Sequence, residues 1–127
     1  WINYGSLKQT QGDLAAAIKL FQQAIDTDPS LALAHYNLGL AHRTRGYLGE
    51  AIAAYQRAIE LQPDYPEAHQ NLGVALFKLG KLPESLAAFS QAVKIYQRTD
   101  PAYAVSLKQR LKSLGLPDAM LAQARLV

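Results

Sequence analysis

The chain has 127 residues, 50% of them hydrophobic, and carries a formal net charge of +3 with no cysteine. The lack of cysteine excludes a disulfide framework and thiol chemistry, and it is compatible with any compartment. No apolar run approaches the ~18 residues of a membrane span, no signal-peptide pattern occurs, and so small a charge does not indicate the dense basic face of a nucleic-acid-binding protein.

Apolar periodicity and punctuation predict helices along almost the whole chain. The expected helices cover residues 2–11, 14–27, 31–45, 48–61, 65–79, 82–97, 101–114 and 119–127. Three residues with short polar side chains are expected to cap helix N-termini: Asp13, Ser30 and Asp64. Three glycines lie where a helix must end and can adopt the left-handed conformation of a C-cap: Gly12, Gly46 and Gly80.

Prolines reinforce these boundaries. Pro29 and Pro63 close two of the helices, because proline cannot continue a helix. Pro66 and Pro83 are tolerated in the first turns of the helices that follow them. Gln97 stands where a closing proline would be expected, so the helix from residue 82 should overrun to about residue 97.

Residues 100–127 are expected to form two further helices. Four apolar side chains of the first share one helical face: Tyr103, Leu107, Leu111 and Leu114. Lys108, Arg110 and Lys112 lie off that face, which is the pattern of a terminal capping helix with one side on its neighbour and the other in water. After Gly115, the segment 119–127 either packs back on that helix or begins a further unit that is cut short.

A fixed period underlies the pattern. Residues 34–63 align with 68–97 after one shift of 34, and with 1–29 after the opposite shift. The recurring residues are small or aromatic: Gly5, Gly39 and Gly73; Ala17, Ala51 and Ser85; Phe21, Tyr55 and Phe89; Ala24, Ala58 and Ala92. Small residues let two helices approach closely, and the ring fills the wedge between them. One unit cannot bury its own apolar face, so neighbouring units must stack.

These positions resemble the tetratricopeptide repeat, a 34-residue helix-turn-helix unit of the pattern W-x2-L-G-x2-Y, A-x3-F, A, P. The matches are Trp1, Tyr4, Gly5, Ala17, Phe21, Ala24 and Pro29, then His35, Leu38, Gly39, His42, Ala51, Tyr55, Ala58 and Pro63, then His69, Leu72, Gly73, Leu76, Ser85, Phe89 and Ala92. Four residues depart from the pattern: Lys8 replaces the aromatic residue, His35 and His69 replace the tryptophan, and Gln97 replaces the closing proline. The resemblance implies an all-α, right-handed superhelical solenoid of antiparallel helix pairs.

The resemblance also implies a division of the chain. Three repeat units, 1–31, 32–65 and 66–99, would be followed by C-terminal capping helices over residues 100–127. Because Trp1 already lies inside a repeat motif, we expect the chain to be cut from a longer protein or processed.

Catalytic and metal chemistry find little support. His35 and His69 are one full repeat apart, and His42 lies two helical turns from His35, so the three do not converge as metal ligands do. Gly39, Gly46 and Gly49 follow no strand and do not form a phosphate loop. We therefore interpret the histidines as packing residues, and we predict neither an enzyme nor a cofactor or metal site.

The resemblance suggests a binding surface on the inner wall, which the first helix of each repeat lines. Asn3, Asn37 and Asn71 recur there at the repeat spacing, and each amide offers an acceptor and two donors to the main chain of a peptide. The remaining candidates are the apolar, amide and cationic side chains around them: Tyr36, Leu40, Arg43, Gln70, Val74, Phe77 and Lys78. The alternatives are that asparagine merely suits the helix contact, and that Phe77 packs on a following helix.

The function expected is therefore a protein-interaction module that binds an extended or helical peptide segment of a partner in its groove. The apolar candidates would take apolar side chains, and Arg43 and Lys78 acidic ones. The alternative is structural self-association, through the end at Trp1 or the apolar tail after Pro117. Nucleic-acid binding is disfavoured because the expected wall is mixed instead of basic.

Overall fold

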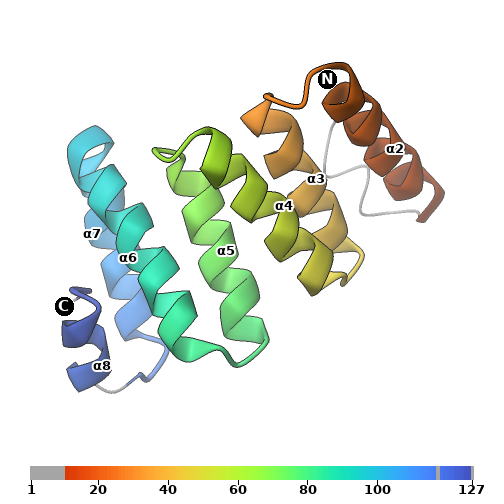
Figure 1. Cartoon of the computed structure of the whole chain (residues 1–127). Helices are drawn as coiled ribbons and strands as arrows, with labels where there is room; N and C mark the ends of the chain where they lie inside the picture. The colour runs from red at the N-terminus through yellow and green to blue at the C-terminus, as the bar shows by residue number, and fades with distance from the viewer. Residues whose placement is uncertain (1–10, 117, 127) are drawn as a thin grey trace. The chain divides into compact units, whose positions relative to one another are not determined.

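The computed structural model describes residues 11–116 and 118–126, and these ranges contain helices and turns but no strand (Figure 1). The chain divides into two units, Trp1–Pro63 and Asp64–Val127. The first contains α2 (Gln11–Thr27), α3 (Ala32–Thr44) and α4 (Leu48–Leu61). The second contains α5 (Pro66–Lys78), α6 (Leu82–Thr99), α7 (Pro101–Lys112) and α8 (Asp118–Gln123). The expected all-α class is confirmed.

The turn between α3 and α4 has the predicted chemistry. Gly46 has a φ of 83°, and its N–H donates to the carbonyl of Arg43 at 2.9 Å while Tyr47 N–H donates to the carbonyl of His42 at 2.9 Å. This pair of bonds satisfies carbonyls at the end of a helix that would otherwise lack partners. The expected helix end at Gly46 is confirmed.

Three expected boundaries in the first unit are wrong. Helix α2 already begins at Gln11, so Gly12 and Asp13 lie inside its first turn instead of ending one helix and capping the next. Ser30 does not cap α3: its N–H and hydroxyl both donate to the Asp28 carboxylate, at 3.1 and 2.6 Å, and Leu31 takes the N-cap position.

The first unit is held by small residues and one large ring. Leu14, Ala17, Ile18 and Phe21 of α2 form a buried cluster with Ala41 of α3. Between α3 and α4, Gly39 faces the fully buried Tyr55, and a Cβ atom added to Gly39 would lie 2.5 Å from its Cε1. The predicted role of this glycine, admitting a neighbouring ring, is confirmed. The helix expected over residues 2–11 lies outside the described residues, except for Gln11.

The second unit repeats the arrangement. Ser85, fully buried on α6, donates its hydroxyl to the Gly73 carbonyl of α5 at 2.7 Å. Gly73 faces Phe89 at 3.0 Å from an added Cβ, so this contact is tight but less so than that of Gly39. Gly80, at a φ of 78°, ends α5 as predicted, and α6 runs past residue 97 to Thr99.

The N-cap expected at Asp64 is wrong. Tyr65 takes the N-cap position of α5 without a side-chain cap bond, and Pro66 fills the first turn as predicted. Asp64 instead lies 3.5 Å from Arg98 of α6, an exposed ion pair. The Asp64 carboxylate therefore contacts the Arg98 guanidinium instead of the N–H groups at the start of α5.

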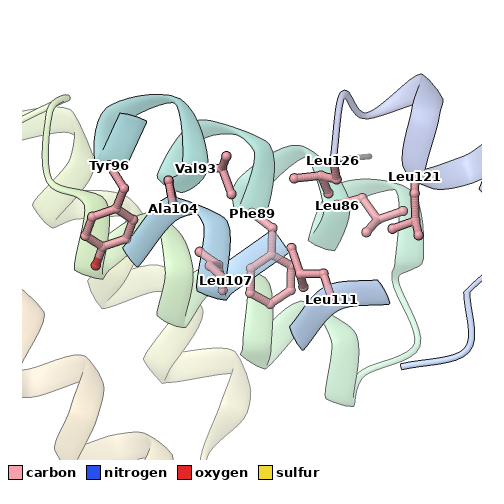
Figure 2. Packing of buried hydrophobic residues seen from close by; sticks show 10 residues of the cluster. Leu86, Phe89, Val93, Tyr96, Ala104, Leu107, Leu111, Leu121 and Leu126 are labelled. Atoms are coloured by element: carbon pink, nitrogen blue, oxygen red, sulfur yellow. The ribbon is translucent and has the colours of Figure 1, made fainter. Parts of the chain in front are cut away.

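The largest apolar cluster of the described residues joins α6, α7 and α8 (Figure 2). Phe89 of α6 packs there with Leu107 and Leu111 of α7, while Leu121 and Leu126 come from the last segment. That segment therefore contributes two leucines to the apolar core of the second unit. Leu114 was expected on the same face, but α7 ends at Lys112 and Leu114 is 46% exposed.

Candidate functional site

Four of the sequence-predicted binding residues lie on α3, and we call them the α3 face: Tyr36, Asn37, Leu40 and Arg43. Tyr36, Leu40 and Arg43 follow one another at helical spacing and therefore share one side of the helix. All four side chains are half-buried. The ring centroid of Tyr36 lies 5.8 Å from that of Tyr55, at an interplanar angle of 43°, so the buried ring supports the half-exposed one.

Five more predicted residues lie on α5, and we call them the α5 face: Gln70, Asn71, Val74, Phe77 and Lys78. Lys78 is exposed and the other four are half-buried. Val74 packs against the cluster of α6, α7 and α8, so it serves the core as well as the surface. The last predicted residue, Asn3, lies outside the described residues.

The asparagine on α5 is anchored to its own helix. Its Nδ2 donates to the Glu67 carbonyl, one turn earlier, at 2.9 Å. This bond uses one of the two N–H donors of the amide and orients the side chain along the helix surface. Every asparagine of the chain (Asn3, Asn37 and Asn71) stands at this one repeat position.

Gln70 is engaged inside the second unit. Its Nε2 donates to the Tyr103 hydroxyl at 2.9 Å, and its Oε1 accepts from the hydroxyls of Tyr96 at 3.2 Å and Tyr103 at 3.3 Å. The rings of Tyr96 and Tyr103 meet edge to face at 4.6 Å. Burial, and next the nearby Glu67 carboxylate, raise the pKa of Tyr96, so its hydroxyl stays a donor at neutral pH. Gln70 thus links α5, α6 and α7.

Tyr103 and Arg110 of α7 were not predicted as surface residues of this site. Arg110 donates to the Tyr103 hydroxyl at 2.8 Å, and its guanidinium lies 5.3 Å from the centre of the Tyr103 ring. Together they extend the α5 face with a half-buried ring and an exposed cation. The repeat period gave no signal for them as surface residues, because Tyr103 stands one period after the buried His69 and Arg110 one period after the buried Leu76.

His35 and His42 lie among backbone and aromatic groups of their own unit. His35 is 9% exposed and its Nε2 lies 3.2 Å from the Pro29 carbonyl. His42 stacks on Tyr47 at 6.3 Å, and its buried Nδ1 has no hydrogen-bond partner among the described residues. Within residues 11–116 and 118–126, no group of three or more His, Cys, Asp or Glu side chains could hold a metal ion.

Two family models cover most of these elements. The model described as "TPR repeat" matches residues 9–46 and 41–80, and the model described as "Tetratricopeptide repeat" matches residues 66–98. The chain belongs to the tetratricopeptide repeat family. The resemblance drawn from Gly39, Tyr55, Gly73 and Phe89 is thereby confirmed.

Solved structures show the same helical-repeat fold. The one described as "MamA RS-1 ArsTM double mutant" is 25% identical, with a TM-score of 0.67 over 75% of this chain and 51% of that chain. "MamA MSR-1 C2" is 24% identical, with a TM-score of 0.65 over 73% of this chain and 53% of that one. "Crystal structure of MamA" is 22% identical, with a TM-score of 0.57 over 99% and 93%. This chain spans about half the length of the first two. The comparison with curated proteins found no match.

Membership of this family makes the chain a protein-interaction or assembly module, and the family is typically non-enzymatic. Of the helices described, none is both long and apolar enough to cross a membrane. The α3 and α5 faces are the surfaces on which the predicted binding residues gather.

Proposed function

We propose that the α3 face and the α5 face bind extended peptide segments of a partner protein. The observation that carries the proposal is their correspondence: Tyr36 and Gln70, Asn37 and Asn71, and Leu40 and Val74 are each one repeat period apart. Each helix thus presents an amide beside half-buried apolar groups. An amide that donates and accepts can pair with the main chain of a peptide whatever its sequence.

The side chains around the amides would give specificity. Tyr36 and Leu40 on α3, and Phe77 on α5, offer apolar surface, which on a soluble protein often marks a binding site. Arg43 and Lys78 would favour acidic groups in the bound segment. Gln70 contributes differently from the expectation: its bonds to Tyr96 and Tyr103 fix the floor of the α5 face, and Tyr103 and Arg110 extend it.

The experiment uses peptides selected by display against the whole chain and measured by fluorescence anisotropy. Asn37→Ala and Asn71→Ala should each weaken binding about fivefold, which corresponds to roughly one hydrogen bond. Gln56→Ala removes an exposed amide from α4 and serves as the control. N-methylation of the peptide amides should reduce the effect of the asparagine variants, because a methylated amide cannot donate to the asparagine oxygen while the peptide carbonyls still accept from its N–H groups. Equal affinities for all three variants would remove the asparagines from the mechanism.

Self-association is the second candidate. Two large apolar side chains of the first unit are more than half exposed, Leu20 at 55% and Leu33 at 60%, and an identical partner could cover them. The route expected through the apolar tail is not supported, since Leu121 and Leu126 are buried in the chain's own cluster. Sedimentation over a concentration series tests the idea: Leu33→Ser should shift a dimer toward monomer, whereas a monomer at all concentrations would reject it.

A further inference from the structure

A groove lies between α6 and α8, on helices that the α3 and α5 faces do not include. Helix α6 has 18 residues and α8 has six, so at ~1.5 Å per residue α8 is only about a third as long as α6. Where α8 ends, a hollow of about 510 Å³ opens between Gln123, Ala124 and Arg125 on one side and α6 on the other. A volume of this size is typical of ligand sites.

A second hollow of about 360 Å³ continues the first along α6. The two share Ala87, Gln123 and Ala124, and we call the pair the α6–α8 groove. The end nearer the start of α6 is apolar, lined by Pro83, Leu86 and Met120. The other end is mixed: the apolar Val93 and Ala124 line it together with the polar and cationic Gln91, Lys94, Gln97 and Arg125. The groove is therefore amphipathic along its length.

The charge of the groove has one sign. Among the residues that the structure describes, its lining includes the cations Lys94 and Arg125 and no aspartate or glutamate. Neither cation forms a salt bridge among the described residues. The glutamine amides beside them can donate to carboxylate oxygens as well. An occupant that places carboxylates at this end and an apolar side chain at the other would complement the whole groove.

The backbone of Arg125 adopts a conformation that is unfavourable for a residue with a side chain. It has a φ of 61°, the left-handed region, which three glycines occupy elsewhere among the described residues: Gly46, Gly80 and Gly115. Its N–H donates to the Ala122 carbonyl at 3.0 Å, and Leu126 N–H donates to the Leu121 carbonyl at 2.8 Å, as at the other helix ends. For a residue with a Cβ this conformation is unfavourable. Glycine adopts this conformation without strain and would end α8 at a lower cost. The need to end the helix therefore does not explain why the residue at position 125 is an arginine.

We propose that the α6–α8 groove binds an acidic segment of a partner protein, with Arg125 and Lys94 holding carboxylates and the apolar end taking a hydrophobic side chain. This site goes beyond the peptide capture proposed for α3 and α5. It would let the module contact one partner through α3 or α5 and another through α6 and α8.

The test uses a fluorescein-labelled peptide of leucine and glutamate residues, with a matched peptide in which glutamine replaces each glutamate. Anisotropy should report binding of the first, at least about tenfold weaker binding of the second, and weakening as NaCl rises from about 0.05 to about 0.5 M. Lys94→Gln and Arg125→Gly should each weaken binding about fivefold. Lys112→Gln, which removes an exposed charge from α7, is the charge-matched control.

Arg125→Gly separates recognition from folding. Because glycine relieves the left-handed strain, the variant should unfold at a higher temperature than the parent while it binds the acidic peptide less well. The losses in Lys94→Gln and Arg125→Gly should persist when Asn37 and Asn71 are also replaced by alanine, because the two sites do not share residues. Equal affinity for the glutamate and glutamine peptides, or equal losses in Lys94→Gln and Lys112→Gln, would overturn the proposal. Tighter binding of a short oligothymidylate, lost in the same variants, would overturn the assignment to an acidic protein segment.

Discussion

Replacing Gly39 with alanine tests how closely α3 and α4 approach. A Cβ atom there would lie 2.5 Å from Cε1 and 2.7 Å from Cδ1 of Tyr55, where carbon atoms prefer about 3.5–4.0 Å. Tyr55 is fully buried, and Tyr36 packs at 5.8 Å, so its ring has little room to move. We expect Gly39→Ala to force the two helices apart.

The magnitude follows from two opposing effects. Alanine in a helix interior is more favourable than glycine by about 1 kcal/mol. Overpacking a tight core costs typically about 1–3 kcal/mol, and an overlap this deep against an immobile ring belongs at or above the upper end. The net expectation is a loss of about 2 kcal/mol in the free energy of unfolding. For Gly73→Ala the nearest atoms of Phe89 lie at 3.0 Å, so the two effects should nearly cancel.

Urea unfolding followed by circular dichroism measures both variants. Gly49→Ala is the matched control, since Gly49 lies in the first turn of α4 with nothing within 4 Å of an added Cβ, and it should stabilise by up to about 1 kcal/mol. The reasoning fails if Gly39→Ala is as stable as the parent chain, or if Gly73→Ala proves the more damaging. Shortening Tyr55 to leucine in the Gly39→Ala background should cost less than the two changes summed.

Three further predictions concern buried groups. Burial lowers the pKa of His42, against the opposing charge of Glu50, so stability present above about pH 6.5 should be lost as the pH falls through the lowered value; urea midpoints across this range measure it. Ser85→Ala removes a 2.7 Å bond to the Gly73 carbonyl and should destabilise by about 0.5 kcal/mol, because better helix propensity offsets part of the ~1 kcal/mol loss. Leu121→Ala should cost about 2–4 kcal/mol in thermal unfolding, since the side chain is 1% exposed.

Each of these has a control in the chain. His42→Leu should flatten the acid limb of the stability curve; an unchanged limb would show that other groups titrate. Ser106→Ala, at an exposed position of α7, should be neutral or stabilising, unlike Ser85→Ala. Leu114→Ala should have little effect because this leucine is 46% exposed, and a loss in Leu121→Ala as small as that of Leu114→Ala would contradict the packing of α8.

The helices and their contacts could be predicted from the sequence because the same small and aromatic residues recur in each repeat. Gly39 and Gly73, with Tyr55 and Phe89, recur at one spacing, and chance does not supply such a period. The turns at Gly46 and Gly80 follow from the left-handed conformation that glycine adopts without strain. At the turns the backbone conformation, and at the helix contacts the packing, favours a residue without a side chain, so the sequence pattern predicts both.

The N-caps could not be predicted in the same way. Ser30 and Asp64 have suitable side chains, but each has a competing partner: the Asp28 carboxylate for Ser30 and the Arg98 guanidinium for Asp64. A serine two residues after an aspartate can bond back to it as readily as it caps a helix. The pairing of Asp64 with Arg98 joins side chains one repeat period apart in sequence. The competing partner cannot be predicted from the identity of Ser30 or Asp64 alone.

The candidate site was predicted in part for a related reason. Most candidate residues of α3 and α5 stand at positions that recur at the 34-residue repeat spacing, so the sequence alone could predict which of them share a helix face. The bonds from Gln70 to Tyr96 and Tyr103 depend on α7, which the pattern treated as a cap instead of a continuation of the repeat. A side chain predicted to meet a ligand therefore also links three helices.

The same period explains where the regularity ends. Tyr103 stands one repeat period after His69, and Leu107 stands one repeat period after Gly73. The buried Leu107 therefore takes the repeat position of the glycine, and Gln123 stands where Phe89 would recur. The glycine–ring contact of the two earlier helix pairs is absent at these two positions, and the last segment, which contains α8, contributes Leu121 and Leu126 to the cluster with α6 and α7. The shorter helix leaves part of α6 uncovered, and the groove beside Arg125 is the result.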